Sequence, residues 1–184
     1  MVGVKGKVAF QGAPGAFSHE ACQAFVPGWE PVAFDSFEAA FEAVKSGDCD
    51  RGCLPIHNVT AGPVEPVVRL LPLSGLQELS RHDLIVRQNL MALPGVKLDE
   101  LKVVASHPMA LGQCRRFLGS LDARAEEAFD TAGAARDLAA SGDRTRAVIA
   151  ARAAAELYGL QILAPDIQDD PSNWTRFIVV SRSR

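Results

Sequence analysis

The stretch that decides the fold is KVAFQGAPGAF, residues 7–17. Its first four residues form a short apolar run typical of a β-strand, and a glycine loop then leads to Phe17. From Phe17 to residue 25 the apolar side chains return every three or four positions, which is the spacing of one face of an α-helix. This stretch therefore predicts a strand, a loop and a helix, the repeating unit of α/β proteins.

The glycine loop of this first unit is itself a candidate site. Backbone N–H groups at Ala13 and Gly15, together with the start of the following helix, can bind an anion because the first turn of a helix leaves its donors unpaired. Gly12 and Gly15 do not form the dinucleotide fingerprint, which needs a third glycine and a later acidic residue. We therefore expect no nucleotide cofactor.

Two further units of the same kind follow in the first third of the chain. Strands are expected at residues 31–34 and 49–56, and Ser36 caps the helix between them. Three such units in succession predict a parallel sheet covered by helices, with ligands at the carboxyl ends of the strands. The third strand ends in His57 and Asn58, so these polar side chains are candidates for a site.

The pattern changes in the middle of the chain. We expect Pro72 to stop a helix that begins near residue 63, and residues 79–93 contain two alternating strands without room for a helix between them. The strand–helix unit then returns, with Ser106 expected to cap a helix that has Pro108 in its first turn. Gln113 is a polar residue beside the apolar face of that helix.

This change of pattern predicts two α/β lobes. Lobe 1 takes about residues 1–77 and 165–184, and lobe 2 takes about residues 78–164. Two connections that cross between lobes leave a cleft, which is a common place for a small ligand. The stretch NWTRF, residues 173–177, ends the second crossing and enters a last apolar strand, so Thr175 and Arg176 are further candidates.

Composition excludes several functions. The chain has 184 residues, 48% of them hydrophobic, and a net charge of −3, which suits a globular protein without a basic nucleic-acid surface. No apolar run approaches the ~18 residues of a membrane span, and the N-terminus has no signal-like apolar segment. We therefore expect a cytoplasmic protein that binds neither nucleic acid nor membrane.

Cysteine and histidine are scattered. The four cysteines lack the spacing of a disulfide framework, and the four histidines do not gather near them. We expect reduced, mostly buried thiols and no metal site.

The motifs taken together resemble the catalytic domain of the prephenate dehydratase family, over residues 8–180. Six motifs occur in the order of that family, and they are GAPGAFS (12–18), PIHN (55–58), SHP with QC (106–108 and 113–114), DTA (130–132), AAELYGL (154–160) and NWTRF (173–177). The resemblance implies two α/β lobes like those of type II periplasmic binding proteins, with the active site between them. It also implies conversion of prephenate to phenylpyruvate, water and carbon dioxide by a hydro-lyase of phenylalanine biosynthesis, without a cofactor.

The resemblance also implies roles for single residues. Prephenate carries two carboxylates and a ring hydroxyl, and uncharged donors suit the carboxylates; the donors expected here are Asn58, Ser106, Gln113 and Thr131. Thr175 is expected to activate the leaving hydroxyl. Arg176 supplies positive charge at the site or faces a structural carboxylate, and both alternatives are open.

Some positions depart from the pattern of the family. His57 and Val59 stand where glutamate and serine are usual, and Asp130 stands where serine is common. A histidine there removes a negative charge and can titrate near neutral pH. The chain also ends at Arg184, where most members continue into a regulatory ACT domain, so feedback inhibition through that domain is not expected. The family is commonly dimeric, which makes a homodimer possible.

Three other functions remain open. The changes at His57 and Val59 favour a decarboxylase that keeps the ring hydroxyl, whereas the presence of Thr175 opposes it. Arogenate differs from prephenate only in its side chain, so an arogenate dehydratase is a second alternative. The third is a non-catalytic protein that binds its ligand in the same cleft.

Overall fold

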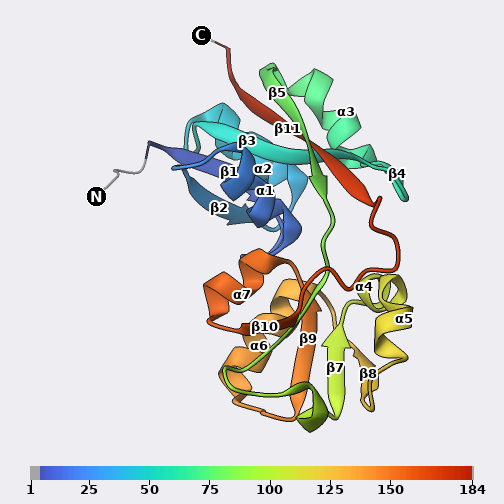
Figure 1. Cartoon of the computed structure of the whole chain (residues 1–184). Coiled ribbons are helices and arrows are strands. Elements are labelled where there is room, and N and C mark those ends of the chain that lie inside the picture. Colours follow the sequence, from blue (N-terminus) through green and yellow to red (C-terminus); the bar gives the residue numbers. More distant parts are fainter. Residues whose placement is uncertain (1–4, 184) are drawn as a thin grey trace. The chain divides into compact units, whose positions relative to one another are not determined.

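The computed structural model describes residues 5–183, which form two compact units. Among these residues, unit 1 comprises 5–13, 17–85 and 172–183, and unit 2 comprises 14–16 and 86–171. Each unit has its own β-sheet with helices packed on it (Figure 1). The expected α/β fold with two lobes is confirmed.

Unit 1 begins with the predicted strand, loop and helix. Its elements in chain order are β1 (Lys7–Gln11), α1 (Phe17–Phe25), β2 (Glu30–Phe34), α2 (Phe37–Ser46), β3 (Arg51–Asn58), β4 (Gly62–Pro63), α3 (Glu65–Ser74), β5 (Leu76–Ile85) and β11 (Trp174–Arg182). The cap predicted at Ser36 is present, because its hydroxyl accepts from Ala39 N at 3.1 Å.

The sheet of unit 1 is mixed. Its strand order is β2-β1-β3-β11-β5, with the short β4 paired to β3. β1 is parallel to β2 and β3, as the repeated units predict, whereas β11 runs antiparallel to both β3 and β5. The last strand of the chain therefore lies between two earlier ones, which places residues 173–177 beside the end of β3.

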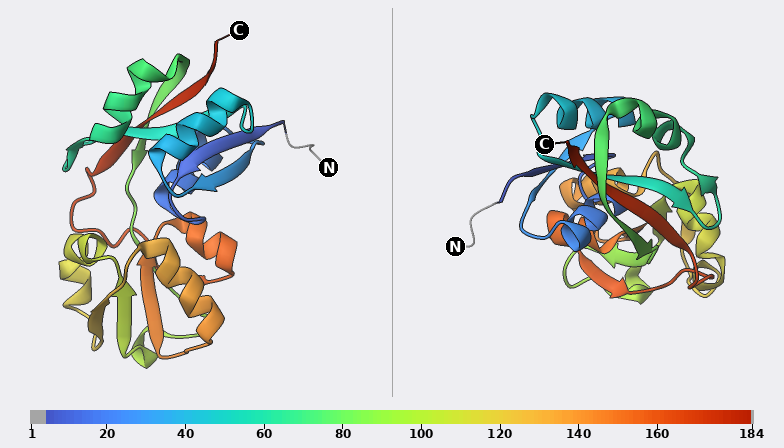
Figure 2. Two further views of the ribbon diagram at one scale, coloured as in Figure 1. Left: turned by 180° about the vertical axis from the view of Figure 1, so that it is seen from behind. Right: turned by 90° about the horizontal axis from the view of Figure 1, so that it is seen from above.

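The two faces of this sheet are covered by different helices. On one face Phe41 and Val44 of α2 pack with Ile178, and α3 adds Val67. On the other face Cys22 of α1 packs with strand residues that include Phe177. Figure 2 shows α1 and the α2–α3 pair on opposite sides of the strands. Adjacent residues of β11 therefore face different helices, as the alternation of side chains along a strand requires.

Unit 2 has a second mixed sheet. Its elements are β6 (Asn89–Ala92), the 3-10 helix η1 (Leu98–Glu100), β7 (Val103–Ser106), α4 (Pro108–Gln113), α5 (Arg115–Leu118), β8 (Arg124–Glu127), α6 (Thr131–Ser141), β9 (Arg146–Ala150), α7 (Arg152–Tyr158) and β10 (Gln161–Ala164). The strand order is β10-β6-β9-β7-β8, in which β7, β8 and β9 are parallel and β6 runs antiparallel to β9.

The core of unit 2 also has two sides. Leu90 packs with residues of α4 on one side of the sheet, and Met91, the next residue of β6, packs with α6 and α7 on the other. The carboxyl ends of β7 and β9 and the beginning of β6 lie at one edge of the sheet, because β6 runs in the opposite direction. Polar residues at these strand ends therefore share that edge.

Three details differ from the sequence-based expectations. β5 belongs wholly to unit 1 because it pairs with β11 from Leu76 to Ile85, whereas we expected a lobe boundary near residue 78. Pro72 does not stop α3, which ends two residues later at Ser74. The cap of α4 is His107, whose Nδ1 accepts from Met109 N at 3.1 Å, because Ser106 is still part of β7.

Within residues 5–183, no helix has the length and apolar character needed to cross a membrane.

Candidate active site

The first polar cluster lies in unit 1, where β3 and β11 end side by side. Thr175 is directly opposite Asn58 in the antiparallel pair. The Asn58 Nδ2 atom donates to Thr175 Oγ1 at 2.9 Å, to Asn173 Oδ1 at 3.0 Å and to the Trp174 carbonyl at 3.0 Å. Two residues that are 117 positions apart in the chain are thereby held in direct contact.

The other end of the Asn58 side chain fixes its orientation. Its Oδ1 atom accepts from the backbone N–H groups of Thr60 at 2.9 Å and Ala61 at 2.8 Å. Since those partners can only donate, the amide NH₂ must be the group that faces Thr175. The Thr175 oxygen is therefore an acceptor in this contact, and its own proton has no acceptor among residues 5–183. A hydroxyl held in this way can donate a hydrogen bond to a ligand.

Arg176 faces the other side of the sheet. Its guanidinium binds Asp83 through Nε–Oδ1 at 2.7 Å and Nη2–Oδ2 at 2.9 Å, and it lies 4.9 Å from the ring centre of Trp174. The hydrogen bonds from Arg176 hold the pKa of Asp83 below its usual value. Of the two alternatives for Arg176, the structure therefore shows the second, in which its guanidinium faces a structural carboxylate, that of Asp83.

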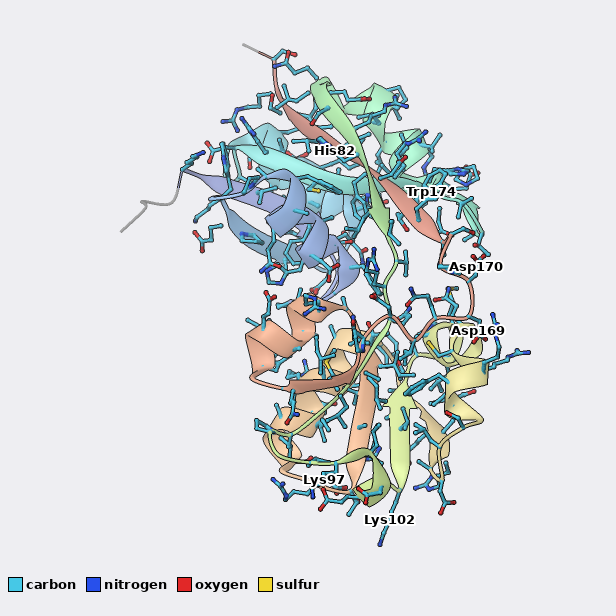
Figure 3. The ribbon with its side chains drawn as sticks, viewed as in Figure 1. His82, Lys97, Lys102, Asp169, Asp170 and Trp174 are labelled. Atoms are coloured by element: carbon cyan, nitrogen blue, oxygen red, sulfur yellow. The ribbon has the colours of Figure 1, made fainter. Side chains whose placement is uncertain are left out.

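His57 lies on the same side as Arg176. It is opposite Arg176 in the strand pair, and its ring centre is 5.8 Å from that of Trp174. Neighbouring residues of a strand point to opposite faces, so His57 points away from the face that carries Asn58. Figure 3 labels Trp174 at the beginning of β11, next to this cluster. Within unit 1 the structure thus groups Thr175 with Asn58 but separates His57 and Arg176 from them.

The second polar cluster lies at the strand-end edge of unit 2. Ser106 is fully buried, and its hydroxyl donates to the Ile149 carbonyl at 2.6 Å. Its proton is therefore paired within unit 2, and binding of a carboxylate by Ser106 stays a prediction. Ser106 joins the ends of β7 and β9.

Gln113 is held in place by its neighbours. Its Oε1 atom accepts from Gln88 Nε2 at 3.0 Å, and its backbone carbonyl accepts from Asp169 N at 2.6 Å. Asp169 also accepts from the N–H groups that begin α5, Arg115 at 3.0 Å and Arg116 at 3.1 Å, and it lies beside α5 in Figure 3. In this orientation of the two amides the Gln113 NH₂ group has no acceptor within the described chain, so it can act as a neutral donor.

Thr131 is the first residue of α6. The preceding Asp130 caps the helix by accepting from Gly133 N at 2.5 Å. The Thr131 hydroxyl and the N–H groups of the first turn remain available in the described structure, since the cap engages only Gly133. Thr131 is therefore placed as a donor for an anion, although the neighbouring Asp130 carboxylate opposes negative charge there.

The glycine loop of residues 12–16 is divided between the units. Ala13 belongs to unit 1, and Gly15 belongs to unit 2. Gly15 has a φ of +91°, and a Cβ atom there would lie 3.1 Å from Ala154 Cα. The Tyr158 hydroxyl donates to the Pro14 carbonyl at 2.9 Å. This packing on α7 explains the glycine, while anion binding by Ala13 and Gly15 stays a prediction.

Sequence reasoning missed two residues of unit 2, Gln88 and Asn89. Both are polar and nearly inaccessible, with 3% and 1% exposure. The signal was two consecutive amide side chains at the start of the apolar run 90–93, where a buried strand normally begins with apolar residues. A buried amide needs partners, so such a pair indicates an ordered polar network.

The cysteine thiols offer no nucleophile. All four are free and buried, as expected. Burial, together with the charge of Asp169, raises the pKa of Cys114 to about 12, and the hydrogen bond to Cys53 and burial raise the pKa of Cys22. Both are protonated at neutral pH, whereas a nucleophilic cysteine must be a thiolate. Residues 5–183 also contain no group of three metal-binding side chains.

Known proteins of similar sequence include plant enzymes. The chain is 44% identical to "Arogenate dehydratase 1" of Petunia hybrida over 178 residues, which are 96% of this chain and 42% of that protein. It is 41% identical to "Arogenate dehydratase/prephenate dehydratase 2, chloroplastic" of Arabidopsis thaliana, over 98% of this chain and 47% of the relative. The chain thus spans less than half the length of these relatives. Six Arabidopsis relatives are named chloroplastic, which overturns the expectation of a cytoplasmic protein.

Solved structures agree on the fold. A protein described as GqqA, a novel type of quorum quenching acylase, is 35% identical, with a TM-score of 0.88 over 97% of this chain and 64% of that one. The prephenate dehydratase of Arthrobacter aurescens in complex with L-Phe is 28% identical, with a TM-score of 0.83 over 97% of this chain and 61% of the other. The family model described as "Prephenate dehydratase" matches residues 8–184. The chain therefore belongs to the prephenate dehydratase family.

Proposed function

We propose that this chain is a dehydratase that aromatises a 4-hydroxycyclohexadiene acid, either prephenate or arogenate. The observation that carries the proposal is the Thr175 hydroxyl, which accepts a hydrogen bond from Asn58 and keeps its own proton available. An aromatising elimination needs such a donor at the leaving oxygen. The family match and the names of the plant relatives support the same reaction.

The reaction asks little else of the protein. The bond from the ring to its carboxylate breaks and releases carbon dioxide, its electron pair enters the ring, and the carbon–oxygen bond at the opposite ring carbon breaks. The departing hydroxide takes up one proton to become water, and the ring becomes aromatic. Thr175 stabilises the charge that develops on this oxygen by donating a hydrogen bond, and solvent supplies the net proton.

The donors of unit 2 suit the carboxylates of such a substrate. Gln113 offers its NH₂ group, and Thr131 offers a hydroxyl at the N-terminus of an 11-residue helix, where the helix dipole favours an anion. We assign these two residues to substrate binding. That they act on the same substrate molecule as Thr175 remains a prediction, as do the roles of Ala13 and Gly15 and a homodimeric assembly.

An acylase activity like that named for one structural relative is a poorer fit. Hydrolysis through Thr175 would require a group that removes its proton. Its hydroxyl contacts an amide NH₂, which cannot accept a proton, and no histidine or carboxylate hydrogen-bonds to it within residues 5–183. Amide hydrolysis is therefore a useful negative control for the purified chain.

Two substrates and three proteins test the proposal. The wild-type chain is incubated with prephenate and with arogenate, and phenylpyruvate or phenylalanine is measured against the spontaneous rate. Thr175→Val removes the hydroxyl at nearly constant shape and should lower kcat by roughly 10²- to 10⁴-fold. Thr145→Val removes an exposed hydroxyl whose only hydrogen bond among residues 5–183 is to Asp143, and it should leave kcat unchanged. Absence of an aromatic product from both substrates contradicts the proposed function.

A further inference from the structure

The Asn89 side chain at the beginning of β6 has a fixed orientation. Its Nδ2 atom donates to two backbone carbonyls, those of Arg87 at 3.0 Å and Ala150 at 3.2 Å. Carbonyl oxygens cannot donate, so the nitrogen must face them and the Oδ1 atom must point elsewhere. This buried oxygen has no hydrogen-bond partner in the described structure.

Gln88 Oε1 is the other buried side-chain acceptor without a partner among residues 5–183. Its orientation depends on that of Gln113, another amide that can be turned around. The orientation of the Asn89 amide is not ambiguous in this way, because two backbone carbonyls fix it. Its oxygen is therefore the clearer sign that a donor is missing, because buried polar atoms in folded proteins are normally paired.

Asn89 lies at the edge of unit 2 where the other candidate residues lie. It is paired with Ala150, the last residue of β9, and Ser106 ends the neighbouring β7. Met91, two residues further along β6, packs with α6 and α7, so Asn89 is on that side of the sheet. α6 packs on β9, and Ala134 in its first turn belongs to the same core cluster as Ala150.

We propose that Asn89 Oδ1 binds the α-ammonium group of the substrate, so that the chain prefers arogenate, which is an amino acid, to prephenate, which is the matching keto acid. This inference rests on the proposed function. An ammonium group has three N–H donors and satisfies the unpaired oxygen with a charge-assisted hydrogen bond. The keto oxygen of prephenate has only lone pairs and would be repelled at the same place.

The charge at this edge favours the same substrate. The cap of α6 is Asp130, and only its Oδ1 atom is engaged by Gly133 N. A carboxylate here attracts a cation and weakens the attraction of the helix N-terminus for an anion. An α-amino acid, with its ammonium beside its carboxylate, suits this mixture of acceptors and donors better than a dianion does.

The wild-type chain tests the inference without a mutation. Isothermal calorimetry compares L-phenylalanine with 3-phenylpropanoate, which has the same ring and carboxylate but lacks the ammonium. Phenylalanine should bind about 10- to 100-fold more tightly, the range expected for one charge-assisted hydrogen bond in a desolvated site. Equal affinities, or no binding of phenylalanine, overturn the inference whether or not the chain is catalytically active.

A matched pair of variants then tests Asn89 itself. Asn89→Leu removes the acceptor, and Met91→Leu alters a fully buried residue of the same strand and face. The ratio of kcat/KM for arogenate to that for prephenate should fall about 10- to 100-fold in the first variant and stay constant in the second. An equal loss on both substrates assigns Asn89 a purely structural role and overturns the inference. If Asn89→Leu does not fold, the comparison of ligands on the wild-type chain decides.

The two proposals fail in different ways. If the wild-type chain converts prephenate at least as efficiently as arogenate, the dehydratase function stands and the ammonium site falls. If it converts neither substrate, the dehydratase function falls, and calorimetry still decides whether the ammonium group is bound.

Discussion

Replacing Asn58 with aspartate tests how Thr175 is oriented. The substitution keeps the size of the side chain but puts a carboxylate oxygen where an NH₂ now donates to Thr175, Asn173 and Trp174 at 2.9–3.0 Å. The Trp174 carbonyl cannot donate to the new oxygen, whereas the Thr175 hydroxyl can rotate and the Asn173 amide can turn over, so that both donate to it. The Thr175 proton would then point into the protein and away from the leaving group.

The size of the effect follows from that hydrogen bond. A hydrogen bond to a charged group is worth about 1.5–3 kcal/mol, and it must break before Thr175 can serve the substrate. Asn58→Asp should therefore lower kcat/KM roughly 10- to 150-fold at neutral pH. The facing backbone carbonyl of Trp174 should raise the pKa of the introduced carboxyl, because this oxygen disfavours the charged form. Its protonated form is again a donor, so the deficit should be present above that pKa and shrink as the pH falls through it.

The assay measures kcat/KM of the variant relative to that of the wild type from about pH 5 to about pH 8. A carboxyl with a raised pKa titrates within this range. Asn173→Asp is the matched control, because it keeps the Oδ1 acceptor that Asn58 uses and should cost far less activity. Wild-type activity of Asn58→Asp at pH 8, or a deficit that grows as the pH falls, would refute the orientation of Thr175 described here.

Three further predictions concern other parts of the chain. Gly15→Ala should lower the free energy of unfolding in urea by about 1–3 kcal/mol, because Gly15 has a φ of +91° and the new Cβ would crowd Ala154. Gly112 lies in a helix with open space around it, so the control Gly112→Ala should raise that free energy by roughly 0.5–1 kcal/mol; the opposite order would contradict the packing of the loop. Arg176→Gln should lower kcat at most about fivefold, as for loss of an exposed ion pair, and a loss like that of Thr175→Val would mean that the guanidinium serves the substrate after all. At pH 8 the native protein should react with a thiol reagent only as fast as it unfolds, because all four cysteines are buried and the pKa values of Cys22 and Cys114 are raised. Rapid labelling of Cys22 or Cys114 would show an accessible thiolate instead.

The sequence predicted those features that depend on local pattern. The glycine loop, the Ser36 cap and the parallel strands of each unit follow from periodicity and turn residues, which are properties of neighbouring positions. The position of β11 between β3 and β5 cannot be predicted in this way, because no local sequence pattern reports which distant strands will pair. Motif order placed Thr175 and Asn58 in one site, but only the strand register shows that they touch.

The local surroundings of other expected site residues also have physical causes. Serine is a common helix cap and a possible donor to an anion. Ser106, however, lies at a buried strand end, where its hydroxyl donates to the Ile149 carbonyl. His57 and Arg176 are adjacent in sequence to true members of the Thr175 cluster, and strand alternation turns them to the opposite face. The sequence does not single out Asn89, because one amide beside an apolar strand carries no functional signal. Only the structure shows that its buried oxygen has no partner among the described residues.

The central claim is that the proton of the Thr175 hydroxyl serves the leaving oxygen, and one ratio tests it most directly. Thr175→Ser keeps a hydroxyl within reach of Asn58, and Thr175→Val keeps the branched shape without it. With the preferred substrate, the serine variant should retain kcat within about tenfold of the wild type and exceed the valine variant by at least about 10²-fold. Equal rates for the two variants would contradict the account, because the shape of the side chain rather than its proton would then carry the reaction.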